Sequence, residues 1–233
     1  MKKKVLAIVT SHGTMKKDTD KTGLWFSELV HFYDVVRVAG FPIDIVSING
    51  GKVPIDPKSL LPVIMDQTSK TYHLDPYFIS KLDHSLPLEE INGQDYDCVF
   101  FAGGHGTLWD FPESKKIQEI TAAIYENGGL VTAVCHGPAA FLRTRLSDGT
   151  HLLENVEVTG YSNIEEKLIF QGGKIPFYLE DELRSVAKSY KKSTIPFTSH
   201  VVEDKRIITG QNPQSARAVG EKTLKILQAH VYQ

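Results

Sequence analysis

Cysteine is scarce in this chain, and long apolar runs are absent from it. Only two cysteines occur among 233 residues: Cys98 lies inside an apolar stretch, whereas Cys135 lies beside polar, turn-forming residues. Settings this different argue against a disulfide framework. No stretch approaches the ~18 apolar residues of a membrane helix, and the run at 5–9 is too short for a signal-peptide core. We therefore expect a cytoplasmic protein with no membrane partner.

A strong excess of either charge is also missing. The formal net charge is −2, from 26 lysines and arginines against 28 aspartates and glutamates. No basic cluster is long enough to indicate nucleic-acid binding. Because 41% of the residues are hydrophobic and 23% are charged, the composition is that of an ordinary globular protein that buries a sizeable core. We expect no nucleic-acid partner.

Strand-like and helix-like patterns alternate along most of the sequence. Strands are predicted at 4–10, 41–47, 96–102, 130–134, 156–160, 201–203 and 207–209, and helices at 22–39, 117–127, 162–170, 177–190 and 213–227. Short helical pieces and loops are expected within 58–90. Such alternation predicts an α/β fold, with a mostly parallel sheet covered by helices on both faces and ligands bound beyond the carboxyl ends of its strands. With no repeat and no linker, residues 1–233 are predicted to form a single domain.

The segment around Cys135 carries the strongest chemical signal. The apolar run 130–134 is typical of a buried strand; Cys135 and His136 follow at once, then Gly137 and Pro138, and then a helix-like stretch. A strand that turns into a helix through one nucleophilic residue is a nucleophile elbow. The N–H groups and dipole of a helix start favour thiolate, the reactive form. The alternative is an inert buried cysteine, which is the better description of Cys98.

Two further regions are predicted to reach the same sheet edge. The glycine-rich loop Gly103-Gly104-His105 follows a strand, and its backbone N–H groups could form an oxyanion hole with that of His136. A tight structural turn is the less favoured alternative for this loop, and a phosphate site is disfavoured because no Lys-Ser/Thr pair follows it. Glu28, on the first helix, is a candidate proton-sharing partner for Cys135, although most glutamates on helices are simply exposed.

Several motifs, taken together and in order, resemble one known family. They lie at 22–25 with Glu28, at 39–41, 50–56, 102–107, 133–138, 176–180 and 208–213. The chain is thereby identified as a member of the PfpI superfamily, which is flavodoxin-like and related to class-I glutamine amidotransferases. Its motifs resemble the branch of heat-shock holding chaperones and glutathione-independent glyoxalases (glyoxalase III). Phe32 stands where relatives carry proline after histidine, which should alter the helix path near Glu28. The extended N-terminal section of larger chaperone members is not seen.

The resemblance implies a set of site residues. Cys135, His136 and Glu166 would form a triad, with Glu28 beneath the sulfur and the loop at 103–105 holding the substrate oxygen. Glu165 would point elsewhere and mainly complement a helix start, so that Glu165→Gln should cost little activity. The implied reaction converts methylglyoxal, a small 2-oxoaldehyde, to lactate through a hemithioacetal. It needs neither metal nor organic cofactor. A homodimer is also implied.

Three other functions remain open at this point. A cysteine peptidase or amidase would use the same nucleophile. A holding chaperone would use exposed apolar surface, and a redox sensor would use Cys135 only as an oxidisable group. Trp25, Trp109 and Phe111 are expected near the site, where they would enclose a small cleft rather than the open groove that a peptidase needs.

Overall fold

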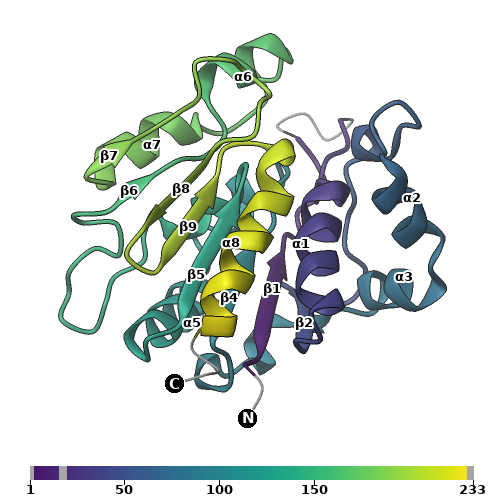
Figure 1. The fold of residues 1–233 in the computed structure, drawn as a ribbon. Helices are drawn as coiled ribbons and strands as arrows, with labels where there is room; N and C mark the ends of the chain where they lie inside the picture. The colour runs from purple at the N-terminus through teal and green to yellow at the C-terminus, as the bar shows by residue number, and fades with distance from the viewer. Residues whose placement is uncertain (1–2, 16–19, 230–233) are drawn as a thin grey trace.

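A seven-stranded sheet forms the centre of the protein, and its strands are mostly parallel (Figure 1). The computed structural model describes residues 3–15 and 20–229. The strands run in the order β3-β2-β1-β4-β5-β9-β8, and only the β8–β9 pair is antiparallel. Their bounds are β1 Val5–Val9, β2 Ile43–Ser47, β3 Leu86–Pro87, β4 Cys98–Phe101, β5 Leu130–Val134, β8 Val201–Asp204 and β9 Ile207–Gly210. Two further strands, β6 Glu157–Val158 and β7 Ser189–Tyr190, pair beside β8.

Helices cover both faces of this sheet. In Figure 1, α1 and α8 lie side by side over one face, and α5 lies on the other. The α-helices are α1 Phe26–Val38, α2 Gln67–Leu74, α3 Pro76–Asp83, α4 Thr107–Asp110, α5 Lys115–Glu126, α6 Asn163–Leu168, α7 Leu179–Val186 and α8 Ala216–Ala229. Short 3₁₀ helices lie at Pro57–Leu60, Leu88–Glu90, Gly93–Asp95, Gly137–Phe141 and Pro213–Ser215. The predicted α/β fold is confirmed.

The core has two layers because strand side chains alternate between the faces. In β1, Val5 and Ala7 pack with α1 and α8, whereas Leu6 packs with α5. All of β1 is buried, which explains its continuous apolar run. Phe32, the departure from the family pattern, lies buried in an unbroken α1 and stacks on Phe100 with ring centroids 3.7 Å apart.

Two predicted elements differ from the structure, and one strand was missed. The helix expected over 177–190 ends at Val186, because Ser189–Tyr190 pairs with β6 instead. The helix expected after Cys135 is a five-residue 3₁₀ helix, Gly137–Phe141. The short edge strand β3, which pairs with β2, was not predicted. Within the described residues, no helix is both long enough and apolar enough to span a membrane.

Candidate active site

Cys135 sits at a sharp corner where β5 ends at the carboxyl edge of the sheet. Its φ is +59°, a left-handed value that costs a non-glycine residue roughly 1–3 kcal/mol. Two backbone hydrogen bonds hold the corner: the Cys135 N–H donates to the Gly210 carbonyl at 2.9 Å, and the Tyr161 N–H donates to the Cys135 carbonyl at 2.8 Å. The next turn is tight as well, since a Cβ on Gly137 would strike the Phe101 carbonyl oxygen. The predicted elbow is therefore present in geometry, followed by a 3₁₀ turn.

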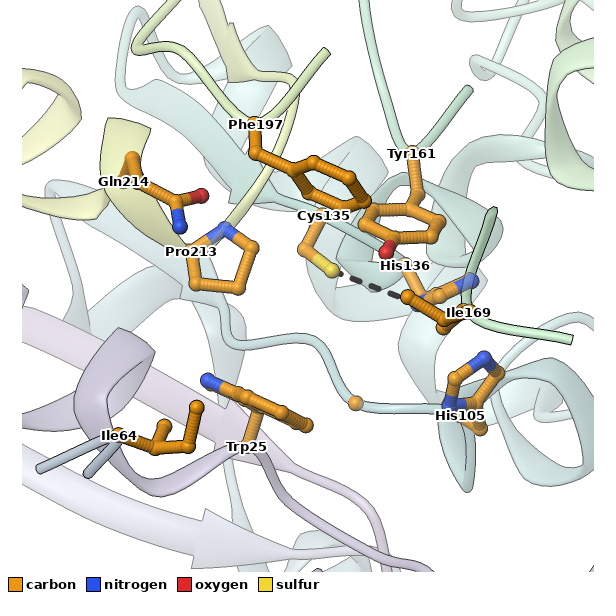
Figure 2. Close-up of a pocket in the computed structure, with 11 residues that line it drawn as sticks. Trp25, Ile64, His105, Cys135, His136, Tyr161, Ile169, Phe197, Pro213 and Gln214 are labelled. Carbon is orange, nitrogen blue, oxygen red and sulfur yellow. Dashed lines mark hydrogen bonds between the residues drawn. The ribbon is translucent and has the colours of Figure 1, made fainter. Parts of the chain in front are cut away.

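The structure brings Cys135, His136 and Glu166 into a chain of contacts. The Cys135 Sγ lies 3.4 Å from Nδ1 of His136 (Figure 2), and Nε2 of His136 lies 2.9 Å from Oε2 of Glu166. Because a carboxylate can only accept, Nε2 carries the proton and Nδ1 presents its lone pair to the sulfur. His136 can therefore act as a base toward the thiol.

Glu166 is shared between two imidazoles. Its other oxygen, Oε1, accepts from Nε2 of His105 at 2.8 Å. Burial opposes ionisation, but the hydrogen bonds from His105 and His136 outweigh it and hold the pKa of Glu166 well below its usual range. Burial, followed by the nearby His105, lowers the pKa of His136 against the pull of Glu166. Resting His136 is thus a neutral imidazole beside a carboxylate.

Glu28 lies next to the nucleophile Cys135 and is fully buried. Its Oε2 accepts from the Gly103 N–H at 2.7 Å, while Oε1 has no hydrogen-bond partner within the described chain. Burial raises the pKa of Glu28 to about 8, although the neighbouring Cys135 thiol and the Gly103 N–H act in the opposite direction. Glu28 is therefore largely protonated near neutral pH, where it can give or take a proton.

The expectation of a thiolate stabilised by a helix start is wrong for the resting protein. Burial and the neighbouring Glu28 raise the pKa of Cys135 well above its ordinary value. The short 3₁₀ helix after Cys135 offers little of the dipole that an α-helix would supply. The thiol is consequently protonated at rest, and deprotonation falls to His136 at 3.4 Å.

The three residues of the glycine-rich loop, Gly103, Gly104 and His105, make different contacts. Gly103 directs its N–H at Glu28 and not at a substrate. Gly104 lines the cavity over Cys135, and in the described part of the chain neither its N–H nor that of His136 donates to a protein acceptor. These two N–H groups are the candidates for the oxyanion role predicted from the sequence, which stays a prediction. His105, placed in that loop by sequence, binds Glu166 instead, although its ring also lines the cavity.

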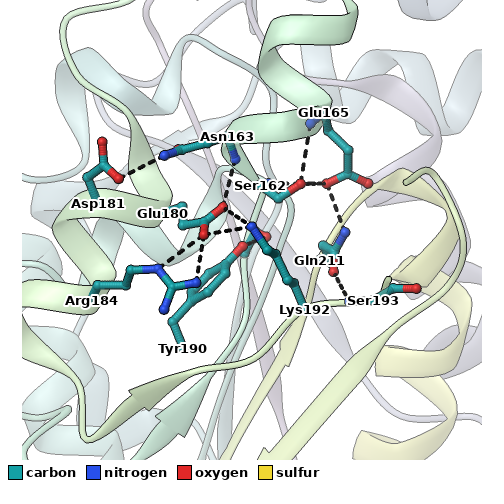
Figure 3. Close-up of polar contacts among 11 residues, drawn as sticks. Ser162, Asn163, Glu165, Glu180, Asp181, Arg184, Tyr190, Lys192, Ser193 and Gln211 are labelled. Atoms are coloured by element: carbon teal, nitrogen blue, oxygen red, sulfur yellow. Dashed lines mark hydrogen bonds and ion pairs between the residues drawn. The ribbon is translucent and has the colours of Figure 1, made fainter. Parts of the chain in front are cut away.

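Glu165 points away from His136, as expected, and closes a capping box with Ser162 at the start of α6, but it is also completely buried. Its carboxylate accepts five hydrogen bonds, from Ser162 Oγ and N–H, Gln211 Nε2, Asn212 Nδ2 and the Phe197 N–H. Figure 3 shows part of this network next to a second one around Glu180. Glu165 therefore ties α6 to two distant loops, one of which carries Phe197 into the cavity wall.

A cavity of about 200 Å³ opens over the Cys135 sulfur. Its lining residues are Trp25, Ile64, Gly104, His105, Cys135, His136, Tyr161, Ile169, Phe197, Pro213 and Gln214 (Figure 2). Trp25 lies there as predicted. Trp109 and Phe111 do not, because Trp109 stacks on His12 and Phe111 is buried in the core beside Phe101.

Tyr161 and the contact between His105 and Glu166 escaped the sequence reasoning. Tyr161 lies with its ring centroid 4.6 Å from that of His136, and its only sequence signal was the family pattern around it. The contact of His105 with Glu166 joins residues 61 positions apart and left no local signal. The ligand atoms of His105, His136 and Glu166 lie within 4.8 Å of one another, a spacing that can hold a metal ion. Both carboxylate oxygens already accept from the two imidazoles, so a metal would have to displace those hydrogen bonds.

Comparison with known proteins shows the family to which the chain belongs. Residues 22–226 match the DJ-1/PfpI family. The glutathione-independent glyoxalase HSP31 of Saccharomyces cerevisiae is 32% identical, with 97% of this chain and 98% of that protein covered. The crystal structure of glyoxalase III from Candida albicans superposes with a TM-score of 0.86 at 30% identity, covering 96% of each chain. The X-ray structure of the Francisella tularensis Rapid Encystment Protein 24 kDa superposes with a TM-score of 0.92 at 39% identity, covering 97% of this chain and 99% of that protein's chain. The chain belongs to the DJ-1/PfpI family.

Proposed function

We propose that this protein is a glutathione-independent glyoxalase that converts methylglyoxal to lactate, with Cys135 as its nucleophile. The observation that carries the proposal is the chain of contacts from sulfur to imidazole to carboxylate at the floor of a cavity. The names of the relatives, glutathione-independent glyoxalases at about 30% identity, support the reaction class.

The first step adds the thiol to the aldehyde. The Cys135 proton moves to Nδ1 of His136, the sulfur forms a bond to the aldehyde carbon, and the carbonyl electrons go to oxygen. The N–H groups of Gly104 and His136 are the donors for that oxyanion, which a returning proton converts to a hemithioacetal. The Glu166 carboxylate stabilises the imidazolium in between.

The second step moves hydrogen between the two substrate carbons. Loss of a proton from the former aldehyde carbon leaves its electron pair in an enediol, and protonation of the keto carbon then gives a lactyl thioester. One carbon is oxidised and the other reduced, so no external oxidant is required. Glu28 is suited to carry these protons because its raised pKa of about 8 lies near the working pH. Water hydrolyses the thioester, releasing lactate and restoring the thiol.

A holding chaperone is the second candidate function. Large apolar side chains are exposed on and after α6, namely Ile164, Leu168 and Phe170. Phe170 is 86% exposed, which is unusual for an aromatic ring. This surface lies outside the cavity lining, so chaperone action would not depend on Cys135.

Incubation of the purified protein with methylglyoxal in the absence of glutathione tests the glyoxalase proposal. We expect lactate to accumulate with a saturable dependence on methylglyoxal. Failure to form lactate while the aldehyde is still consumed would point to simple thiol trapping, and would contradict the proposed turnover. Aggregation of a heat-denatured client, measured in parallel, tests the chaperone candidate.

A further inference from the structure

The cavity over Cys135 is larger and more apolar than methylglyoxal requires. Its volume of about 200 Å³ corresponds to several water molecules at ~30 Å³ each. Polar groups gather at its floor, where Cys135, His136 and His105 lie, whereas rings and aliphatic side chains form the walls. Methylglyoxal has little beyond its two carbonyls except a methyl group. With those carbonyls on the floor, most of the apolar wall would stay without a partner.

The walls are arranged around a space for one apolar substituent. In Figure 2, the Trp25 indole lies across the open space from Phe197 and Tyr161, with the Cys135 sulfur facing the same space. Ile64 and Ile169 lie on either side. These residues come from separate parts of the chain, so the space is a product of the fold.

A second hollow adjoins the cavity on its outer side. This hollow, of about 310 Å³, shares Trp25, Ile64, Pro213 and Gln214 with the cavity and extends to the outer part of α1.

The backbone around Phe197 is held in place by specific contacts, which indicates that this part of the cavity wall has a fixed position. Phe197 has a left-handed φ of +58°, and its N–H donates at 2.8 Å to the buried Glu165. A strained backbone persists only when its surroundings hold it. Phe170 offers a contrast: it has a similar φ of +57°, but it is mostly exposed and does not line the cavity.

We infer that the preferred substrates are 2-oxoaldehydes whose substituent is apolar and bulkier than methyl, such as a branched alkyl or aryl group. The dicarbonyl lies at Cys135 and the substituent packs between Trp25 and Phe197. This inference rests on the proposed function and keeps its chemistry, so each substrate takes up one water and yields the corresponding 2-hydroxy acid.

A homologous series of alkylglyoxals tests the inference, because lengthening the alkyl group changes carbonyl reactivity little. We measure kcat/KM for the methyl, propyl and isobutyl compounds, with phenylglyoxal alongside. The isobutyl compound is expected to exceed methylglyoxal by about tenfold or more, since added methylenes in an apolar pocket change kcat/KM by ~10–200-fold. Phe197→Ala should reduce the ratio of kcat/KM for the isobutyl compound to kcat/KM for methylglyoxal by about tenfold. The matched control Phe170→Ala should leave this ratio unchanged. Ile64→Ala, on another wall, provides a second variant if Phe197→Ala does not fold.

Protection of Cys135 from iodoacetamide by each aldehyde provides a readout independent of turnover. If lactate forms but kcat/KM stays constant or falls as the substituent grows, the inference is overturned and the proposed function stands. If no aldehyde is turned over, the proposed function fails, and protection decides the inference. Protection that strengthens with substituent size supports the apolar occupant, and protection independent of size rejects it.

Discussion

Two adjacent glutamates illustrate how differently identical side chains act at this site. Glu166 accepts from the two imidazoles, whereas Glu165 accepts five hydrogen bonds that join α6 to distant loops. The choice of Glu166 as the residue that contacts His136 could be made from the family pattern. The burial of Glu165 could not, because its donors Gln211, Asn212 and Phe197 lie far away in the sequence and only folding brings them together.

Exchange of each glutamate for glutamine should separate activity from stability. Glu166→Gln is expected to lower kcat by ~10²–10⁴-fold with a near-normal Tm, because His136 loses the carboxylate that sets its tautomer and stabilises its charge. Glu165→Gln should instead lower Tm by several degrees. Both carboxylate oxygens of Glu165 accept hydrogen bonds, and in the variant the NH₂ group of glutamine would replace one of them and face N–H or O–H donors that have lost their acceptor. Steady-state kinetics and thermal melts check both variants. Equal and mild effects on kcat would remove Glu166 from the triad.

The raised pKa of Glu28 predicts a pH-dependent stability. In the folded protein Glu28 keeps its proton up to about pH 8, whereas in the unfolded chain it ionises near 4.5. Its contribution to stability is therefore complete below pH 4.5 and is lost as the pH rises toward 8, at about 1.4 kcal/mol per pH unit. Urea unfolding at pH 5.5 and 7.5 should show wild type losing stability relative to Glu28→Gln as the pH rises. If the difference in unfolding free energy between wild type and Glu28→Gln does not vary with pH, Glu28 is not protonated in the folded protein as inferred.

At the scale of elements, the corner after β5 depends on close backbone packing. Gly137 begins the 3₁₀ helix, and a Cβ there would collide with the Phe101 carbonyl oxygen on β4. Gly137→Ala should therefore destabilise the protein by ~1–3 kcal/mol and lower turnover by displacing Cys135. Gly173→Ala is the matched control, because a Cβ at Gly173 meets nothing within 4 Å. Chemical denaturation and kinetics of both variants provide the check, and equal behaviour would rule out the tight packing at the corner.

The errors in predicting elements have a common physical origin. Helix propensity and periodicity describe neighbours along the chain, whereas Ser189–Tyr190 forms a strand because it meets Glu157–Val158 across the fold. The Tyr190 hydroxyl also donates to the Gly160 carbonyl at 2.6 Å, another contact with no local sequence signal. Similarly, Gly137 and Pro138 predict a turn into a helix but do not distinguish a 3₁₀ turn from an α-helix.

For the whole molecule, the sheet was predictable where its strands are buried on both faces. Runs such as Val5–Val9 and Leu130–Val134 are continuously apolar, and this pattern distinguishes them from surface strands. The order of the strands was not accessible in this way, because parallel pairing joins segments far apart in sequence. Family resemblance indicated a flavodoxin-like fold, but the strand order itself was not predicted. The single domain over 1–233 stays a prediction.

The proposed mechanism depends on Cys135 as the nucleophile. Comparison of the two cysteines of the protein, Cys135 and Cys98, tests this role most directly. We propose to measure lactate formation from methylglyoxal by wild type, Cys135→Ser and Cys98→Ser, with folding confirmed by circular dichroism. Cys98 is buried within β4 and is the internal control, although its serine variant carries a modest cost in stability. The account predicts that Cys98→Ser retains turnover and that folded Cys135→Ser has none. Lactate formation by Cys135→Ser at a rate near that of wild type would contradict it.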